Sequence, residues 1–501
     1  MSQHDDTTSG PAKFEHKAPK APLAAAFASV AGWAFDLFDL FLLLYVAGPV
    51  GRQIFPAHSE TLSLAAVFAS FAVSVLMRPA GAAIFGELAD RKGRKAIMVT
   101  VFAGVGLSTA AMGLVPTYVT IGLAAPIIFL VLRIIQGLFV GGVTATTHTL
   151  GTESVAPRWR GLMSGLVGGG GAGLGAALAS IVFIVVSTIF VGEAFDDLGW
   201  RFMFFSGLLG ALLSLFVLTK VEESPLWVAE QARAKARAKA DPNAVQAKRM
   251  RFRDLATGRY RKILFINIAV TAGAGAQYYL TSGFLPTLLD SVVQMPASGR
   301  GTVLLVSSLV VVVSATAAGE LSERIGRRKT MLTLGAVNLV ALPLITLALV
   351  NVDPTSTGSV LLLACLLAML ANAAYAPVMV FLNERYPTAL RSRGTAVSWN
   401  TGFMLGGLTP TFVNLLSPTI GEVPGRLAIF LVGAVVVFLI AVAVSPETRG
   451  NLDRPETTED PTEDYAQGSP RGQQKPTDIR AAEGTPSWLC PPRTSPTASS
   501  S

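Results

Sequence analysis

The chain has 501 residues, of which 51% are hydrophobic and only 14% charged, and its formal net charge is +8. The charged share is far below the quarter or so that is typical of a soluble globular domain, which excludes that class. Most Lys and Arg lie in short runs between long apolar stretches, a distribution that does not indicate nucleic-acid binding, and two cysteines are too few for a disulfide framework or a metal site.

Twelve apolar runs follow one another along the chain. A helix crosses the hydrocarbon core of a bilayer with about 20 apolar residues, so each run is a candidate membrane span. The turn Pro116-Thr117-Tyr118 separates the third run from the fourth. The predicted spans are 21–48, 62–85, 96–115, 119–149, 162–190, 200–219, 263–289, 302–320, 330–351, 360–383, 394–417 and 426–445.

The basic residues orient these spans. They gather in the loops after the even-numbered spans, and loops rich in Lys and Arg stay in the cytoplasm, so both termini are expected inside the cell. Residues 1–20, which have no signal-peptide core, and residues 451–501 are expected to be disordered cytoplasmic tails. The basic segment 220–262 is expected to be a cytoplasmic linker near anionic lipid, or alternatively a regulatory site.

Two loop motifs recur at a constant offset. Gly86-Glu-Leu-Ala-Asp-Arg-Lys-Gly-Arg-Lys returns as Gly319-Glu-Leu-Ser-Glu-Arg-Ile-Gly-Arg-Arg, and the two leading glycines are 233 positions apart. Gly161, after the fourth span, and Gly394, after the tenth, are also 233 positions apart. A shared offset at two motifs indicates a duplicated unit of six spans. We therefore predict an all-α membrane protein with two pseudo-symmetric six-helix bundles, 21–219 and 263–450.

These loops have the chemistry of a cytoplasmic gate. A glycine lets helices approach, an acid can face the N-terminus of a neighbouring helix, and arginines can pair across the cytoplasmic side. The alternative is that the charges only fix the topology. The residues assigned to the gate are Gly86, Asp90, Arg91, Gly93, Arg94, Glu153, Arg160, Gly319, Glu323, Arg324, Gly326, Arg327, Glu384 and Arg393.

Further motifs carry a resemblance to a known family. They are Leu114-Val-Pro-Thr-Tyr118, Arg133-Ile-Ile-Gln136-Gly137, Glu223-Ser-Pro-Leu-Trp227, Phe284-Leu-Pro-Thr287, Arg393-Gly-Thr-Ala-Val-Ser-Trp399-Asn400 and Ser445-Pro-Glu-Thr-Arg-Gly450. Over about residues 23–450 the chain resembles the major facilitator superfamily, and within it the metabolite:proton symporters. The resemblance implies the major facilitator fold. It also draws attention to two departures: Asp36 stands where the symporters usually have Glu, and Val143 stands where another Glu is usual, which puts a copied proton pathway in doubt.

Charged residues inside the apolar runs are candidates for function. Asp36 and Asp39 share one face of the first span, and Asp36 lies about 20 Å along that helix at 1.5 Å per residue. An acid at that depth is costly and normally faces a cavity, where low dielectric and the second acid favour proton uptake. Arg133 lies at comparable depth in the fourth span. We expect it to pair with one of the aspartates and to exchange that partner for substrate or proton; a permanent structural ion pair is the alternative.

Polar and aromatic residues of later spans suit a substrate cavity with aromatic walls. The expected substrate-binding residues are Arg133, Gln136, Gln277, Tyr278, Tyr279, Tyr375, Trp399 and Asn400. The run Gly168-Gly-Gly-Gly171-Ala-Gly173-Leu-Gly175 lacks the Gly-Lys-Ser/Thr of a phosphate loop, so it is interpreted as a helix-packing surface.

These observations predict a secondary active transporter in the cell (inner/plasma) membrane. The leading hypothesis is proton-coupled uptake of a small organic acid by alternating access, with Asp36 and Asp39 carrying the proton. The alternatives are a symporter for a zwitterionic osmolyte, an exporter of drug-like solutes, and a nutrient sensor that signals through its linker and tail. We expect a functional monomer whose partners are substrate, protons and lipid, with no cofactor and no enzymatic activity.

Overall fold

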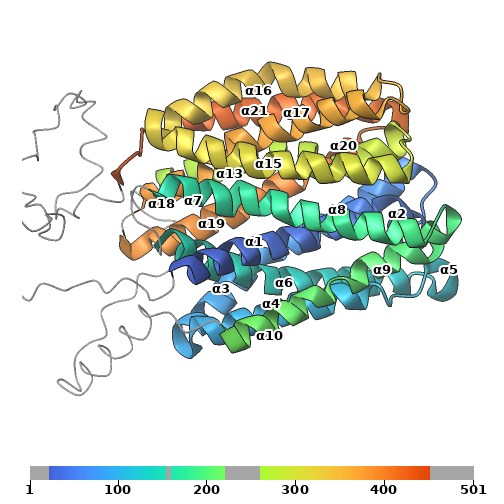
Figure 1. The fold of residues 1–501 in the computed structure, drawn as a ribbon, viewed down its shortest axis with the longest axis horizontal. Helices are drawn as coiled ribbons and strands as arrows, with labels where there is room; N and C mark the ends of the chain where they lie inside the picture. Colours follow the sequence, from blue (N-terminus) through green and yellow to red (C-terminus); the bar gives the residue numbers. More distant parts are fainter. Residues whose placement is uncertain (1–21, 154–158, 221–259, 387, 452–501) are drawn as a thin grey trace, which may run out of the picture. The chain divides into compact units, whose positions relative to one another are not determined.

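The computed structural model describes residues 22–153, 159–220, 260–386 and 388–451, and every regular element in these ranges is helical (Figure 1). The predicted tails and nearly all of the predicted linker lie outside the described residues. The first half consists of α1 (Pro22–Tyr45), α2 (Ala47–Ile54), α3 (Glu60–Lys92), α4 (Arg94–Met112), α5 (Tyr118–Ile121), α6 (Ala124–Glu153), α7 (Arg160–Gly165), η2 (Leu166–Gly170), α8 (Gly171–Ile189), η3 (Phe195–Gly199), α9 (Trp200–Phe205) and α10 (Leu208–Lys220).

The long helices of the second half follow one another in the same order. This half consists of α13 (Tyr260–Tyr278), η4 (Tyr279–Gly283), α14 (Leu285–Thr287), η5 (Leu288–Val292), α15 (Ala297–Ile325), α16 (Arg327–Val350), α17 (Thr357–Tyr375), α18 (Val378–Glu384), α19 (Thr388–Gly407), α20 (Thr409–Leu415), η6 (Ile420–Glu422) and α21 (Val423–Ala443). The predicted turn between the third and fourth spans is confirmed, because α4 ends at Met112 and α5 begins at Tyr118.

Ten helical segments among the described residues are long and apolar enough to cross a membrane. The pair Ser29–Tyr45 and Ala47–Ile54, bent by 60°, brings the number to eleven if it is one span. The predicted span 394–417 falls on α19 and α20 and is not in this set. Its polar residues, such as Thr395, Ser398 and Asn400, are buried inside the protein, so polarity on the inner face hides the span from a hydropathy test. Twelve spans therefore stay a prediction.

The duplication is visible in the backbone. Gly93 joins α3 to α4 with φ 101° and ψ 150°, and Gly326 joins α15 to α16 with φ 106° and ψ 149°. The two glycines are 233 positions apart, the same offset as the loop motifs. Only glycine adopts this positive φ without strain, so the same tight corner is built from the same residue in both halves.

The two halves contact each other along two seams. In the first seam α7, η2 and α8 pack on α15, and in the second α3 packs on α19 and α20. Figure 1 shows α8 running beside α15, with α4 and α10 on one side of the bundle and α16 and α21 on the other.

Small residues allow the closest helix approaches. A Cβ at Gly137 would lie 2.1 Å from Ser74 O, and one at Gly141 would lie 2.1 Å from Arg78 O. Four residues apart, these glycines let the backbone of α6 touch that of α3. In the glycine run of the fifth span, a Cβ at Gly175 would lie 2.3 Å from Ala34 O of α1, as expected for a helix-packing surface.

Candidate functional site

Four charged side chains are buried together in the first half. Asp36 and Asp39 come from α1, Arg78 from α3 and Arg133 from α6, and none is more than 7% exposed. Two acids with two bases make the cluster electrically balanced. Facing the protein interior removes the cost that each charge would have against lipid, which explains why α1, α3 and α6 pack with these faces inward.

Asp36 pairs with Arg78. Arg78 Nη2 lies 3.3 Å from Asp36 Oδ1, and Nη1 donates to Oδ2 at 3.4 Å, so the guanidinium faces both carboxylate oxygens. Gly141 positions this arginine, because it lets α6 rest against the Arg78 backbone. Arg78 was missed in the sequence analysis, although it is an arginine inside the apolar run 62–85 and satisfies the rule that identified Arg133.

Asp39 has neutral hydrogen-bond partners. Gln136 Nε2 donates to Asp39 Oδ1 at 2.8 Å and to Oδ2 at 2.7 Å, and the Thr109 hydroxyl donates to the same carboxylate. Gln136 Oε1 in turn accepts from Arg133 Nη1 at 2.6 Å. The expected direct pairing of Arg133 with an aspartate is therefore wrong: among the described residues no such ion pair lies within 4 Å, and Gln136 stands between them.

Arg133 has two N–H donor groups that no described residue accepts from. Its Nε and Nη2 atoms are buried and have no partner within the described residues, and its guanidinium lies 5.5 Å from the centre of the Phe129 ring. The Nε and Nη2 groups together form one free edge of the guanidinium, which can bind a planar carboxylate in a forked pair, the geometry that arginine provides and lysine does not. Its partner Gln136 fixes the remaining edge.

Aromatic rings from both halves form a wall, which we define as Trp33, Phe71, Tyr278, Tyr279, Tyr375, Trp399 and Phe403. Each ring contacts the next along the wall. The distance between ring centroids is 5.7 Å for Trp33 and Trp399, 4.5 Å for Trp399 and Phe403, and 5.2 Å for Phe71 and Tyr279. The hydroxyls of Tyr278 and Tyr279 are buried and have no hydrogen-bond partner among the described residues. The wall brings together four of the expected substrate-binding residues, and its other three members, Trp33, Phe71 and Phe403, were not singled out from the sequence.

Two other expected substrate-binding residues, Gln277 and Asn400, already make hydrogen bonds within the protein. Gln277 donates to Gly273 O at 3.1 Å, and its Oε1 accepts from Asn338 Nδ2 at 3.1 Å, which ties α13 to α16. Asn400 is 1% exposed and donates to Ala396 O one turn earlier in α19. These bonds give both side chains a packing role in the structure; a role in binding substrate stays a prediction.

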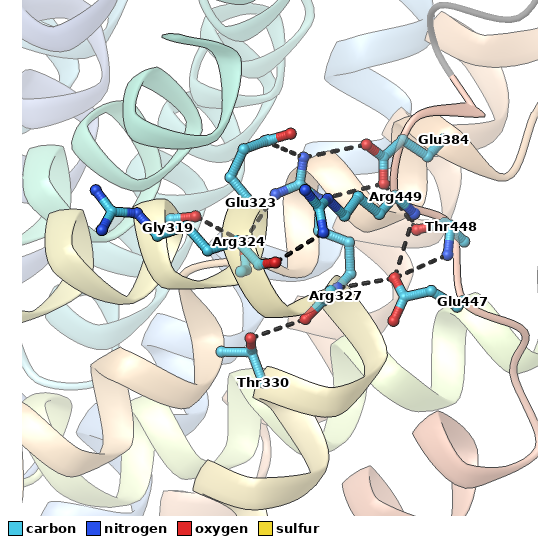
Figure 2. Close-up of polar contacts among 11 residues, drawn as sticks. Gly319, Glu323, Arg324, Arg327, Thr330, Glu384, Glu447, Thr448 and Arg449 are labelled. Atoms are coloured by element: carbon cyan, nitrogen blue, oxygen red, sulfur yellow. Dashed lines mark hydrogen bonds and ion pairs between the residues drawn. The ribbon is translucent and has the colours of Figure 1, made fainter. Parts of the chain in front are cut away.

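At the end of the second half that carries the loop motif, a buried arginine organises an acidic cluster (Figure 2). Arg327 Nη2 lies 2.5 Å from Glu323 Oε2 and 3.2 Å from Glu384 Oε1, and its Nη1 donates to Ser322 Oγ at 2.9 Å. The Thr448 hydroxyl donates to Glu384 Oε2 at 2.7 Å. Figure 2 shows Arg327, Glu384 and Thr448 converging from α16, α18 and the segment after α21.

Glu447 binds the N-terminus of α16. Its carboxylate accepts from the backbone N–H of Arg327 at 2.8 Å and of Arg328 at 3.1 Å, where the helix dipole favours an anion. This corner requires glycine because Gly326 has φ 106°, and a Cβ there would also lie 2.5 Å from Glu447 Oε2. In the second half the acid that faces a helix N-terminus is thus Glu447, whereas the loop acid Glu323 accepts from the Arg327 side chain. Glu447 lies in the motif Ser445–Gly450, which carries the family resemblance, but this acid was not assigned to the gate from the sequence.

The other gate predictions have mixed outcomes. Arg324 pairs within α15 with Glu320 at 3.1 Å, and Arg91 pairs within α3 with Glu87, so neither bridges the two halves. A Cβ at Gly86 would meet nothing within 4 Å, whereas one at Gly165 would lie 3.2 Å from the Cα of Gly319, where α7 meets α15. The side chains of Asp90, Arg94, Glu153, Arg160 and Arg393 lie outside the described residues.

Known proteins resemble this chain over most of its length. The model of the "Sugar (and other) transporter" family matches residues 27–452. The proline/betaine transporter of Escherichia coli (strain K12) is 30% identical over 370 residues, which cover 73% of this chain and 72% of that protein. The ectoine/proline transporter of Corynebacterium glutamicum is 28% identical over 364 residues, with 70% of each chain covered. The inner membrane metabolite transport protein YhjE of E. coli K12 is 30% identical over 404 residues, covering 79% and 87%.

Solved structures share the fold. The inward open xylose transporter of E. coli superimposes with a TM-score of 0.63 at 18% identity, covering 86% of this chain and 97% of that one. A proton:xylose symporter of the major facilitator superfamily bound to 6-bromo-6-deoxy-D-glucose gives 0.64 at 17% identity, covering 86% and 97%. The buried charges, the paired halves and these similarities agree: the chain is a multi-pass membrane transporter that belongs to the sugar (and other) transporter family, with the major facilitator fold.

Proposed function

We propose that the protein is a secondary active transporter of the cell membrane that couples proton entry to the uptake of a small zwitterionic osmolyte by alternating access. This replaces an organic acid as the first choice of substrate. The observation that carries the proposal is the balanced cluster of two buried acids and two buried arginines in the half that contributes Trp33 and Phe71 to the aromatic wall.

A zwitterion carries one carboxylate and one cationic nitrogen, and the described residues offer a complement for each. The free edge of Arg133 that carries Nε and Nη2 suits the carboxylate. The faces of the wall suit a substituted ammonium, because aromatic rings attract such cations. A solute that carries only carboxylates has no cationic group for the aromatic rings of the wall to attract. Relatives described as proline/betaine and ectoine/proline transporters support the same substrate class.

Asp39 is the better candidate for the proton carrier. Its partners Gln136 and Thr109 are neutral, so protonation of Asp39 breaks no ion pair. Protonation of Asp36 would leave Arg78 as an unpaired buried cation. Gln136 contacts both Asp39 and Arg133, so a proton on Asp39 changes the hydrogen bonding of the arginine that is proposed to hold the substrate.

The remaining expectations complete the mechanism. Twelve spans with both termini in the cytoplasm place the loop motifs on the cytoplasmic side. There the cluster around Arg327 would hold the ends of the second-half helices together while the two halves rock about the proposed binding site. We keep the expectation of a functional monomer.

The test is uptake of labelled solutes into proteoliposomes, with and without an inside-alkaline pH gradient. We expect L-proline or glycine betaine to accumulate, and accumulation to collapse with a protonophore. A labelled monocarboxylate should not accumulate. Accumulation of the carboxylate alone would restore the organic-acid hypothesis. Movement of none of the three would favour an exporter of drug-like solutes or a sensor.

Arg133 provides the matched mutagenesis test. Arg133→Lys keeps the charge but loses the fork, so we expect KM for the zwitterion to rise about tenfold or more, the loss of one charge-assisted hydrogen bond. Arg52→Gln is the control, because Arg52 is half-exposed and pairs with Asp196 at 2.7 Å, away from the cluster. Equal KM values for the two variants would remove Arg133 from the binding site.

A further inference from the structure

A small cavity lies between the two halves, beside the aromatic wall. Its lining includes Phe41 and Tyr45 of α1, Tyr278 and Ser282 of the α13–η4 region, Ser308 of α15 and Asn372 of α17. Its volume is about 20 Å³, room for a single water-sized group. A cavity of this size accepts one polar head of a solute and excludes the rest of it.

Asn372 has an unused acceptor. Its side chain is 1% exposed, and its Nδ2 donates to Ala368 O and to Ser282 Oγ at 2.8 Å each. Its Oδ1 has no partner in the part of the chain that the structure describes. The orientation of the amide is fixed, because Ala368 O can only accept and therefore requires the nitrogen beside it. A buried carbonyl oxygen without a donor is rare in proteins and calls for an explanation.

The other lining groups also favour a donor with positive charge. The Ser308 hydroxyl already donates to Leu304 O at 2.6 Å, so only its lone pairs remain available. The Tyr278 hydroxyl is buried, and no described residue hydrogen-bonds to it. The Phe41 ring stands edge-on to those of Tyr278 and Tyr45, at 6.3 and 5.8 Å between centroids. Acceptor oxygens among aromatic rings match an ammonium group that carries N–H bonds.

We propose that this cavity is the ammonium subsite of the transporter, and that Asn372 Oδ1 accepts an N–H of the substrate. The inference rests on the proposed function and deepens it. It makes Asn372 a specificity-determining residue: a secondary or primary ammonium gains this hydrogen bond, whereas a quaternary ammonium has no N–H to donate and its methyl groups exceed the space. A site that hydrogen-bonds a substrate N–H discriminates strongly against the analogue that lacks it.

The experiment compares uptake of L-proline, a secondary amine, with uptake of glycine betaine, a quaternary amine, in proteoliposomes. For Asn372→Leu we expect kcat/KM for proline to fall about tenfold to a hundredfold, and kcat/KM for glycine betaine to change less than about threefold. Tyr278→Phe is the second variant, because it removes only an unpartnered hydroxyl and threatens folding least. It should lower proline uptake in the same selective way.

Asn414→Leu is the matched control. Asn414 is also 1% exposed, also donates to the carbonyl four residues earlier and also has a free Oδ1, but it does not line the cavity. It should leave the ratio of proline to betaine uptake unchanged. Equal losses for both solutes in Asn372→Leu, or no loss, would overturn the subsite while wild-type transport still upheld the proposed function. A wild-type protein that moves neither solute would overturn both.

Discussion

The two halves of this transporter share a loop motif and differ in their interiors. Between the two anchors of the repeat, the first half carries Thr109, Arg133 and Gln136 in its buried polar cluster. The positions 233 residues later hold Leu342, Leu366 and Met369. The second half has its own buried amides, Asn338 and Asn372, and their first-half counterparts are Val105 and Phe139.

The difference indicates which parts of a duplicated fold keep the same residues and which parts change. The corner glycines Gly93 and Gly326 keep the same φ and ψ because both halves need the same tight loop between their second and third helices. Residues of both halves line the small cavity between them, and we propose that each half contacts a different part of one asymmetric solute. Charge and proton transfer are proposed for the first half, and the neutral aromatic and amide groups for the second.

The largest expected effect comes from unbalancing the charged cluster. Arg78→Gln leaves Asp36 as a buried carboxylate without its cation, which costs about 3–5 kcal/mol, and the variant should be poorly stable. The double variant Arg78→Gln/Asp36→Asn should regain most of the loss. The measurement is the apparent Tm in detergent by intrinsic fluorescence. A single variant as stable as the wild type would show that the pair is not what keeps these charges in the interior.

A second prediction separates the two aspartates. Asp39→Asn mimics a permanently protonated carboxyl, so the variant should exchange solute across the membrane but lose accumulation driven by a pH gradient. One pH unit supports about tenfold accumulation for each proton carried, so the concentration ratio should drop from near ten to near one. Asp196→Asn, which alters the half-exposed pair with Arg52 away from the charged cluster, is the control. Accumulation that survives in Asp39→Asn would assign the proton to another group.

A third prediction compares two glycines of the first half, Gly165 in α7 and Gly86 in α3. A Cβ at Gly165 would lie 2.7 Å from Ala315 O, so Gly165→Ala forces α7 and α15 apart and should cost about 1–3 kcal/mol. Gly86→Ala meets open space and lies within a helix, so it should be neutral or stabilise by up to about 1 kcal/mol. Thermal unfolding of the two variants, side by side, checks the contrast. Equal shifts would mean that the contact between the halves at Gly165 does not contribute to stability.

The smallest expected effect concerns the helix-capping acid of the second half. Glu447→Gln keeps a hydrogen-bond acceptor at the N-terminus of α16 but loses the charge that the helix dipole favours, a cost of about 1 kcal/mol. Glu422→Gln is the control, because Glu422 belongs to a half-exposed pair with Arg426 at 3.7 Å, worth little. The difference in apparent Tm between the variants should be a few degrees and should shrink at high salt.

Much of the site could be predicted from residues that are too polar for their surroundings. Asp36, Asp39 and Arg133 stood out in apolar runs, and the structure places all three in one cluster. Arg78 satisfied the same rule and was overlooked. The pairing was not predictable, because Arg133 reaches Asp39 only through Gln136, a neutral residue that one sequence does not distinguish from an ordinary packing amide.

The sequence by itself determined the membrane class, the duplication and the identity of the side chains that must avoid lipid. Those properties depend on local composition and on spacing along the chain, which hold whatever the packing. Only the tertiary structure decided that Asp36 meets Arg78 while Asp39 meets Gln136, because these partners lie 42 and 97 positions apart. Their meeting depends on the rotation of each helix and on the close approach that Gly137 and Gly141 allow between α3 and α6.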